Sequence, residues 1–396
     1  MKPVFGIHIG NTNASMAICK DNDHPDIVAN DSGERLTPVN ITVTDNEILV
    51  GAAAKSAALH DKTTISSNKT VMNMNVNLIK KLQDHKKINI TVINDEVYYC
   101  LTVGGKLKYI TPTEIATQIL KKLYQIARNT LNSNEEKISC VLLAPAHSCE
   151  EFCENYRTSA ENAGWTVIQI VNEPAAAVLS YSLLDTNKPL QTILVYRLGG
   201  TTYEVAAYEM INGMLFLLNS EHSEEIGGFH FTNTLFEYFA DEFLKKHKLN
   251  VKENRRALNK LYLAAETCVH NLSKMWTANC YIESLQEGVD FMATVSRPQF
   301  ELIIQSILSE LTEPIKHVLN KLELERPVDI IILCGGATNI PKLQSSITNL
   351  FDPEVTQVLT CPNLDEVLAL GAAKQAYYLD HYKVTTFLPR SQEIHF

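Results

Sequence analysis

The sequence predicts an α/β fold made of two similar lobes around a central cleft, and three recurring features support that prediction. Glycine turns begin at Gly10 and Gly199, 189 residues apart. Strand-then-helix runs that begin with ISCVLLAPA and VDIIILCGG recur at an offset of 190 residues. Acidic residues that open alanine-rich helices, Glu173 and Glu366, lie 193 residues apart. Features that recur in one order at nearly one offset indicate a duplicated lobe. A solenoid would instead repeat about every 20 to 50 residues.

The first element of each lobe is a strand, a tight glycine turn and a returning strand. The run VFGIHIGNTNASMAIC has its turn at Gly10, Asn11, Thr12 and Asn13. The run TILVYRLGGTTYEVAAYEM has its turn at Gly199, Gly200, Thr201 and Thr202. Backbone amides and threonine hydroxyls in such turns can cradle phosphate oxygens.

Two further glycine pairs belong to the same pattern. Gly227 and Gly228 in EEIGGFHF come directly before a predicted helix, whose N-terminus favours an anion. Gly335 and Gly336 in CGGAT follow a buried strand. One such turn is most often only structural, but four of them, two in duplicated positions, indicate a phosphate-binding cleft between the lobes.

The duplication divides the chain into lobe I at 1–186 and lobe II at 187–385. Inserted subdomains are expected at about 40–112 and about 227–307. The second insertion begins with a helix that carries an apolar residue at every fourth position, which is typical of a core-facing stripe: Phe231, Leu235, Phe239 and Phe243. Residues from about 366 to 385 are expected to form a C-terminal helix that packs back, followed by a tail at 386–396.

Composition limits the function classes. The net charge is −10, which argues against broad binding to nucleic acid or an anionic membrane. The basic cluster Lys80, Lys81, Lys86 and Lys87 is expected to be a solvated face or, alternatively, a contact for ribosomal RNA or an acidic partner. No apolar run is long enough to span a bilayer and no secretory signal is evident, so the cytosol is expected. Nine cysteines without a CxxC pair suggest neither a disulfide framework nor a zinc site.

Taken together, these motifs resemble those of the seventy-kilodalton heat-shock chaperones over nearly the whole chain. The signatures, in the family's order, are VANDSGERLTPVNI, VGAAAKSAA, VNEPAAAVLSY, IGGFHFTNTLFEYF, LCGGATNIPKLQ and LDEVLALGAA. The resemblance implies the actin-like ATPase fold with ATP or ADP in its cleft. The run IGGFHFTNTL and the basic residue before the second hairpin look more like an atypical, ribosome-associated branch. That branch implies a J-domain co-chaperone and the ribosome as partners, with unfolded or nascent polypeptide as an indirect one.

The resemblance also assigns site residues. It implies phosphate contacts at Asn11, Thr12, Asn13, Thr201, Thr202, Gly227 and Gly228. It implies nucleoside contacts at Glu266, Ser273, Gly336, Asn339 and Asp365. Two arginines that flank adenine in the family are replaced by His270 and Asn339, which weakens the expected hold on the base.

The catalytic positions depart most from the family. Active members place aspartates where this chain has His8 and Arg197, and their catalytic lysine aligns with Asn75, so only Glu173 is kept. A neutral histidine is a poor Mg²⁺ ligand. Arg197 within about 5 Å of Mg²⁺ would repel the ion by on the order of 6 kcal/mol at an effective dielectric of 20. The sequence therefore names no metal ligand and does not favour a bound Mg²⁺.

Two interpretations of Arg197 stay open: it replaces the charge of the metal by donating to phosphate, or it pairs with Glu173. The function expected is a chaperone-family nucleotide-binding domain that binds ATP with little or no hydrolysis and acts through a J-domain partner. The alternative is an ATP-hydrolysing chaperone that assists folding and refolding with rearranged catalytic groups. A sugar or acetate kinase is disfavoured because no acceptor-substrate motif stands out. The family's peptide-binding region is not in this sequence, either because it was removed or because the protein lacks its own client site.

Overall fold

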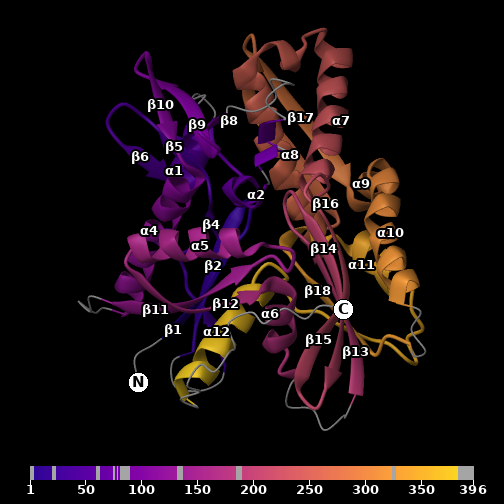
Figure 1. Cartoon of the computed structure of the whole chain (residues 1–396). Helices are drawn as coiled ribbons and strands as arrows, with labels where there is room; N and C mark the ends of the chain where they lie inside the picture. Colours follow the sequence, from indigo (N-terminus) through magenta and orange to yellow (C-terminus); the bar gives the residue numbers. More distant parts are fainter. Residues whose placement is uncertain are drawn as a thin grey trace.

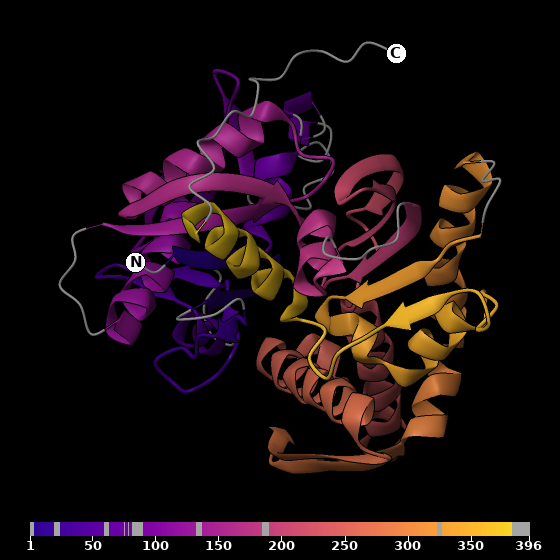
Figure 2. The same cartoon turned by 90° about the horizontal axis from the view of Figure 1, so that it is seen from below.

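The computed structural model describes residues 4–19, 24–58, 63–74, 76–77, 79–80, 90–131, 137–183, 190–322 and 327–381. Two large β-sheets stand side by side, and helices cover them (Figures 1 and 2). No helix among the described residues combines the length and the apolar character that a membrane crossing needs.

The sheet of lobe I has the strand order β12-β11-β1-β2-β3. Its strands are β1 (Val4–Ile9), β2 (Asn13–Ile18), β3 (Asp26–Ile27), β11 (Ile138–Ala144) and β12 (Trp165–Asn172), and the short β4 (Thr37–Pro38) also pairs with β2. Strand β1 runs antiparallel to β2 and parallel to β11, and β11 runs parallel to β12.

The sheet of lobe II repeats this topology with the order β19-β18-β13-β14-β15. Its strands are β13 (Leu190–Leu198), β14 (Tyr203–Ile211), β15 (Met214–Ser223), β18 (Ile330–Cys334) and β19 (Gln357–Leu359). Strand β13 runs antiparallel to β14 and parallel to β18, and β18 runs parallel to β19. The two sheets therefore match strand for strand and sense for sense, which confirms the predicted duplicated α/β fold.

The helices also recur, and the last helix of each half packs beside the other half. The helices outside the insertions are α4 (Pro112–Leu131), α5 (Glu150–Asn162), α6 (Glu173–Ser180), α10 (Gln305–Leu322), α11 (Pro341–Thr348) and α12 (Val367–His381). Helix α12 follows the strands of lobe II but packs on β1, β2 and α6 (yellow in Figure 2). Helix α6 follows the strands of lobe I but contributes to the core of lobe II. The predicted tail lies outside the described residues.

Two glycines permit the close approach of α12. A Cβ atom added at Gly371 would lie 1.8 Å from the carbonyl oxygen of Ala176 in α6. A Cβ atom at Gly6 in β1 would lie 2.1 Å from the backbone nitrogen of Ala373. Since these contacts are with backbone atoms, any side chain at either glycine would force the elements apart.

The insertions form the upper parts of Figure 1. The first contains β5 (Ile41–Val43), β6 (Ile48–Val50), α1 (Ala52–Ala57), β7 (Thr64–Ile65), α2 (Asn68–Asn73), β8 (Ile90–Ile93), β9 (Glu96–Val103) and β10 (Lys106–Ile110). The second contains α7 (Phe229–His247), α8 (Arg255–Lys274), β16 (Thr277–Gln286), β17 (Val289–Ser296) and α9 (Arg297–Ile303). The four apolar residues of the predicted α7 stripe are all fully buried, which confirms that this stripe faces the core.

We expect Gly371→Ala to destabilise the fold by about 2 kcal/mol or more, because overpacking against backbone outweighs the roughly 1 kcal/mol that alanine gains in a helix. Chemical denaturation followed by circular dichroism measures this change. Gly33→Ala is the control, since nothing lies within 4 Å of its added Cβ and only its φ of +78° opposes the substitution. Equal losses for both variants would show that α12 does not depend on close contact.

Candidate functional site

A cleft lies between the lobes, with about 1230 Å³ of empty space that includes open solvent. Both hairpin turns, the start of α7, one face of α8 and the turn after β18 line it. Sixteen of the predicted site residues are in its wall: His8, Gly10, Asn11, Thr12, Asn13, Arg197, Gly199, Gly200, Thr202, Gly228, Glu266, His270, Ser273, Gly335, Gly336 and Asp365. Of the other predicted site residues, Thr201, Gly227, Asn339 and Glu173 are not, and Asn75 lies outside the described residues.

The two hairpin turns have the same hydrogen bond and face each other. The Gly10 amide donates to the Asn13 carbonyl at 2.9 Å, and the Gly199 amide donates to the Thr202 carbonyl at 2.8 Å. A Cβ atom at Gly200 would lie 2.3 Å from the side chain of Thr12. The turns therefore touch at the centre of the molecule, and each lobe contributes one of them to the cleft floor.

The start of α7 does not offer the free amides that the sequence suggested. The Gly228 amide donates to the Gly199 carbonyl at 2.9 Å, and the Phe229 amide donates to the Gly200 carbonyl at 2.8 Å. The His230 amide donates to the Gly227 carbonyl within the turn. These donors hold the helix against the second hairpin, and an anion at this helix start stays a prediction.

Two other predicted contacts, Asn11 and Asn339, are engaged with the protein itself, and the hydroxyl of a third, Thr201, is buried without a hydrogen-bond partner in the described part of the chain. The Asn11 amide group donates to the Thr70 hydroxyl at 2.8 Å, and the Asn339 amide group donates to the Gly336 carbonyl at 3.0 Å. The Thr201 hydroxyl is buried and has no hydrogen-bond partner among the described residues. Asn11 therefore links the first turn to α2, and this link uses one of the two N–H donors of its amide group.

One face of α8 forms the far wall of the cleft. Tyr262, Glu266, His270 and Ser273 follow one another at helical spacing along this face. Tyr262 was missed from the sequence, although a position four residues before Glu266 has to share its face. Phe229 at the start of α7 was missed as well.

Ion pairs join the insertions and lobes around this cleft. The Lys55 amine in α1 donates to Glu266 in α8 at 2.7 Å, so the pair bridges the two insertions. Arg35 donates to both oxygens of Glu366 at 2.5 and 2.7 Å. The Lys55 bridge uses a carboxylate that the resemblance had assigned to the nucleoside.

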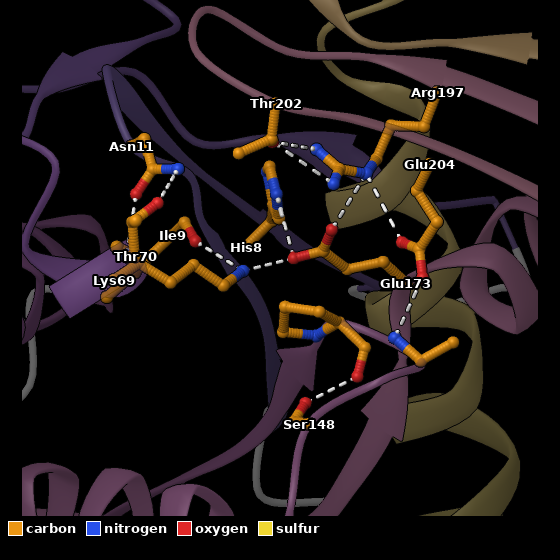
Figure 3. Close-up of polar contacts among 12 residues, drawn as sticks. His8, Ile9, Asn11, Lys69, Thr70, Ser148, Glu173, Arg197, Thr202 and Glu204 are labelled. Carbon is orange, nitrogen blue, oxygen red and sulfur yellow. Dashed lines mark hydrogen bonds and ion pairs between the residues drawn. The ribbon is translucent and has the colours of Figure 1, made fainter. Parts of the chain in front are cut away.

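The catalytic end of the cleft is a cluster of basic groups around one carboxylate (Figure 3). Glu173 is 1% exposed, and its Oε2 lies 3.0 Å from Arg197 Nε. The Lys69 amine donates to Oε1 of Glu173 and, at 2.8 Å, to the Ile9 carbonyl. His8 Nε2 lies 3.5 Å from the same Oε1. Glu173 is thus shared by three basic side chains from both lobes.

This environment determines the protonation of the cluster. Burial alone would raise the pKa of Glu173, but Lys69 and then Arg197 hold that pKa well below its usual range. Burial lowers the pKa of His8, which keeps its imidazole neutral near pH 7. Glu173 is therefore a stable anion and a weak base, which makes it a poor acceptor of a proton from water.

Lys69 was not among the residues singled out from the sequence. The family's lysine aligns with Asn75, whereas the amine that reaches Glu173 comes from α2, six positions earlier. The cleft therefore has a cation beside Glu173 that the alignment did not identify, while the assignment of Asn75 to the position of the family's lysine stays a prediction. The contact between Lys69 and Glu173 depends on the direction in which the Lys69 side chain leaves α2, which the structure shows.

Arg197 also faces a second carboxylate. Glu204 is its directly opposed partner in the β13–β14 register, and Glu204 Oε2 lies 3.5 Å from Arg197 Nε. Counting outward from the glycine turn would have found this neighbour. The guanidinium nitrogens Nη1 and Nη2 both donate to the Thr202 hydroxyl, each at 3.3 Å. The structure thus contains the pairing with Glu173, while donation to a phosphate stays a prediction.

A second cluster lies behind Glu204. The rings of His147 and His222 stack at 3.5 Å with an interplanar angle of 2°. His147 lies between Glu204 at 3.7 Å and Glu224 at 3.9 Å. Burial opposes protonation, but the two carboxylates raise the pKa of His147 to about 9. Burial and the charged ring beside it lower the pKa of His222.

These donors do not fit a magnesium ion. In the described part of the chain, no three histidine, cysteine or carboxylate side chains are grouped so that they could hold a metal. Glu173 and Glu204, the nearest carboxylates to the second hairpin, are both paired with Arg197. A divalent cation there would have to displace a buried guanidinium.

Two lobes with matching sheets, whose hairpin turns meet across a cleft, define the actin-like class of nucleotide-binding folds. A family model described as Hsp70 protein matches residues 4–388. Heat shock 70 kDa protein 14 of Mus musculus and that of Homo sapiens are each 34% identical over 377 residues, which cover 94% of this chain and 73% of theirs. The Danio rerio counterpart is 35% identical over 383 residues, covering 94% and 74%. The chain therefore belongs to the Hsp70 protein family and has that family's nucleotide-binding domain fold, as the sequence motifs predicted.

We expect the stability of the fold to fall as His147 loses its proton. The folded-state pKa of about 9 exceeds the 6.5 of an ordinary histidine, so the ion pairs contribute fully below pH 6.5 and are lost as the pH rises through about 9. Thermal unfolding of wild type and His147→Gln from pH 7 to 10 measures this, and their difference should shrink with rising pH. His317→Gln, an exposed histidine, is the control. A pH-independent difference would contradict the charged state of His147.

Proposed function

We propose that this chain is a chaperone-family domain that binds ATP or ADP, hydrolyses ATP slowly or not at all, and acts through a partner protein. ATP and ADP are the nucleotides that the Hsp70 family binds in this domain. The observation that supports weak hydrolysis is the cluster around Glu173, where His8 and Arg197 stand at the positions of two family aspartates. Hydrolysis requires a metal, a cation and a group that orients water. This cluster supplies the cation alone.

The active ATPase is the second candidate, and Lys69 is the observation that favours it. Its amine lies beside Glu173 at the catalytic end of the cleft, so one catalytic charge has a replacement. The carboxylates that would hold Mg²⁺ have no comparable replacement among the described residues. We therefore keep the slow or absent hydrolysis as the main proposal.

Partner binding is the second half of the proposal. Hsp70 proteins work with J-domain co-chaperones and polypeptide substrates. On the resemblance of its motifs to those of a ribosome-associated branch, we propose a J-domain partner and a role in co-translational folding at the ribosome, in the cytosol. Unfolded or nascent polypeptide would then be an indirect partner.

Affinity capture from cytosol with the tagged chain is expected to recover a J-domain protein together with ribosomes. Capture with an unrelated tagged domain of similar net charge controls for ionic adsorption. The partnership would be refuted if both were missing in low salt and high salt alike.

We expect ATP to bind with little dependence on Mg²⁺ and to depend on Arg197. Arg197→Ala should lower the affinity for ATP by roughly ten- to a hundredfold, because charge-assisted hydrogen bonds contribute about 1.5 to 3 kcal/mol. Calorimetric titration with EDTA or with Mg²⁺ tests both statements. Arg128→Ala, an exposed arginine on α4, is the control for the loss of one positive charge. Tight binding that requires Mg²⁺ and is unaffected by Arg197→Ala would show that the arginine serves only as the partner of Glu173.

We expect single-turnover ATP hydrolysis to be absent or far slower than in active family members. Loss of one preorganised charge-stabilising group costs about 10² to 10³ in rate, and losses within one site are not additive. The assay is run with and without a J-domain protein. A family-typical rate that Glu173→Ala and Lys69→Ala each abolish would overturn the main proposal and establish the active ATPase.

A further inference from the structure

A side chamber adjoins the main cleft behind the hairpin turns. It has about 330 Å³ of empty space, a figure that includes open solvent, and its wall includes Lys69, Glu173 and His147. Gly10, Asn11, Arg197 and Thr202 line both the chamber and the cleft. The chamber therefore adjoins the cleft, and these four residues form the wall that the two spaces share.

Arg197 in this chamber is a buried cation with unmet hydrogen-bonding capacity. Its side chain is 9% exposed, and a guanidinium has five N–H donors. Nη1 and Nη2 share one acceptor, the Thr202 hydroxyl, at 3.3 Å each. Nε lies within ion-pair distance of two carboxylates but has no aligned hydrogen bond among the described residues. Arg197 therefore has donors that an anion in the chamber could engage.

Glu173 lies between the two cations, and each of its carboxylate oxygens pairs with one of them. Its Oε1 accepts from Lys69, and its Oε2 lies 3.0 Å from Arg197. Like Nε of Arg197, Oε2 has no aligned hydrogen bond. A carboxylate and a phosphate oxyanion are recognised by the same donors, so one can take the place of the other.

We propose that Lys69 and Arg197 form a two-cation site for the terminal phosphate group of a nucleotide, and that Glu173 is a built-in anion that competes with that phosphate. This inference rests on the proposed nucleotide binding and names the groups that distinguish a triphosphate from a diphosphate. Glu173 in this role is a specificity-determining residue. It lowers the affinity for ATP and keeps two buried cations paired when no phosphate is present.

The charges that face the site explain why the competition is strong. Lys69, Arg197 and protonated His147 contribute three positive charges. Glu173, Glu204 and Glu224 contribute three negative charges. His8 is neutral. A phosphate that enters this balanced group adds negative charge, which is unfavourable unless a carboxylate is displaced or removed. Glu173 is the carboxylate that touches both cations.

The test is calorimetric titration of ATP, ADP and inorganic phosphate in EDTA. Glu173→Gln keeps the shape of the side chain and removes its charge. We expect this variant to bind ATP about tenfold more tightly or better and to change the affinity for ADP by less than about threefold. Binding of inorganic phosphate should become measurable. Glu237→Gln, an exposed carboxylate paired with Lys252 on the surface, is the matched control and should change none of the three.

Lys69→Gln is the second variant, because Glu173→Gln leaves two buried cations without their partner and can impair folding. It retains the pair between Glu173 and Arg197. It should lower the affinity for ATP by about tenfold and leave the affinity for ADP unchanged. Lys69→Arg should restore the preference for ATP in part, since it restores the charge.

The outcomes separate this inference from the proposal beneath it. If wild type and variants bind neither ATP nor ADP, nucleotide binding itself fails, and the inference fails with it. If wild type binds both nucleotides but Glu173→Gln lowers the affinity for ATP, or changes the affinities for ATP and ADP equally, only the two-cation site is overturned. If phosphate binds Glu173→Gln while ATP gains nothing, the chamber takes free phosphate and the terminal phosphate of a nucleotide does not reach it.

Discussion

The buried carboxylate of Glu173 is the electrostatic link on which the cleft depends. It joins Lys69 on α2 and His8 on β1 to Arg197 on β13, so both hairpin turns and one insertion meet at a single side chain. Removing one partner from such a buried group costs about 3–5 kcal/mol, because a charge is left unpaired. The same carboxylate opens α6, the helix that carries lobe I into the core of lobe II. The electrostatics of the site and the packing of the lobes therefore start from one residue.

Much of the fold could be predicted from the sequence, because its signals are local or repeated. The glycine turns, the aliphatic strands and the α7 stripe depend on near neighbours in the chain, and the offsets between the halves revealed the duplication. The sequence predicted a C-terminal helix that packs back, but it did not predict that this helix packs on β1, β2 and α6, since that packing depends on contacts as short as those at Gly6 and Gly371. Those contacts join segments far apart in the chain.

The site was predictable to the extent that it resides in turns. The hairpin and β18 turns meet in the cleft, but the start of α7 is held by Gly199 and Gly200 and has no free amides there. An alignment compares positions in the chain, but the place of a lysine amine in the site also depends on the direction in which its long side chain points. Lys69 reaches Glu173 from another turn of the chain, and the sequence alone does not give that direction. Asn11 shows the converse, since its position was found but not its bond to Thr70.

The packing of α12 under the sheet of lobe I has a consequence for synthesis of the chain. The Cys19 thiol in lobe I donates to the Ala373 carbonyl at 3.6 Å, across a separation of 354 residues. A ribosome adds about 5–20 residues each second, so β1 and β2 exist for tens of seconds before their covering helix is made. During that interval one face of an apolar sheet is open to water and to other chains. A domain of a chaperone family thus spends its own synthesis as the kind of incomplete polypeptide that chaperones bind.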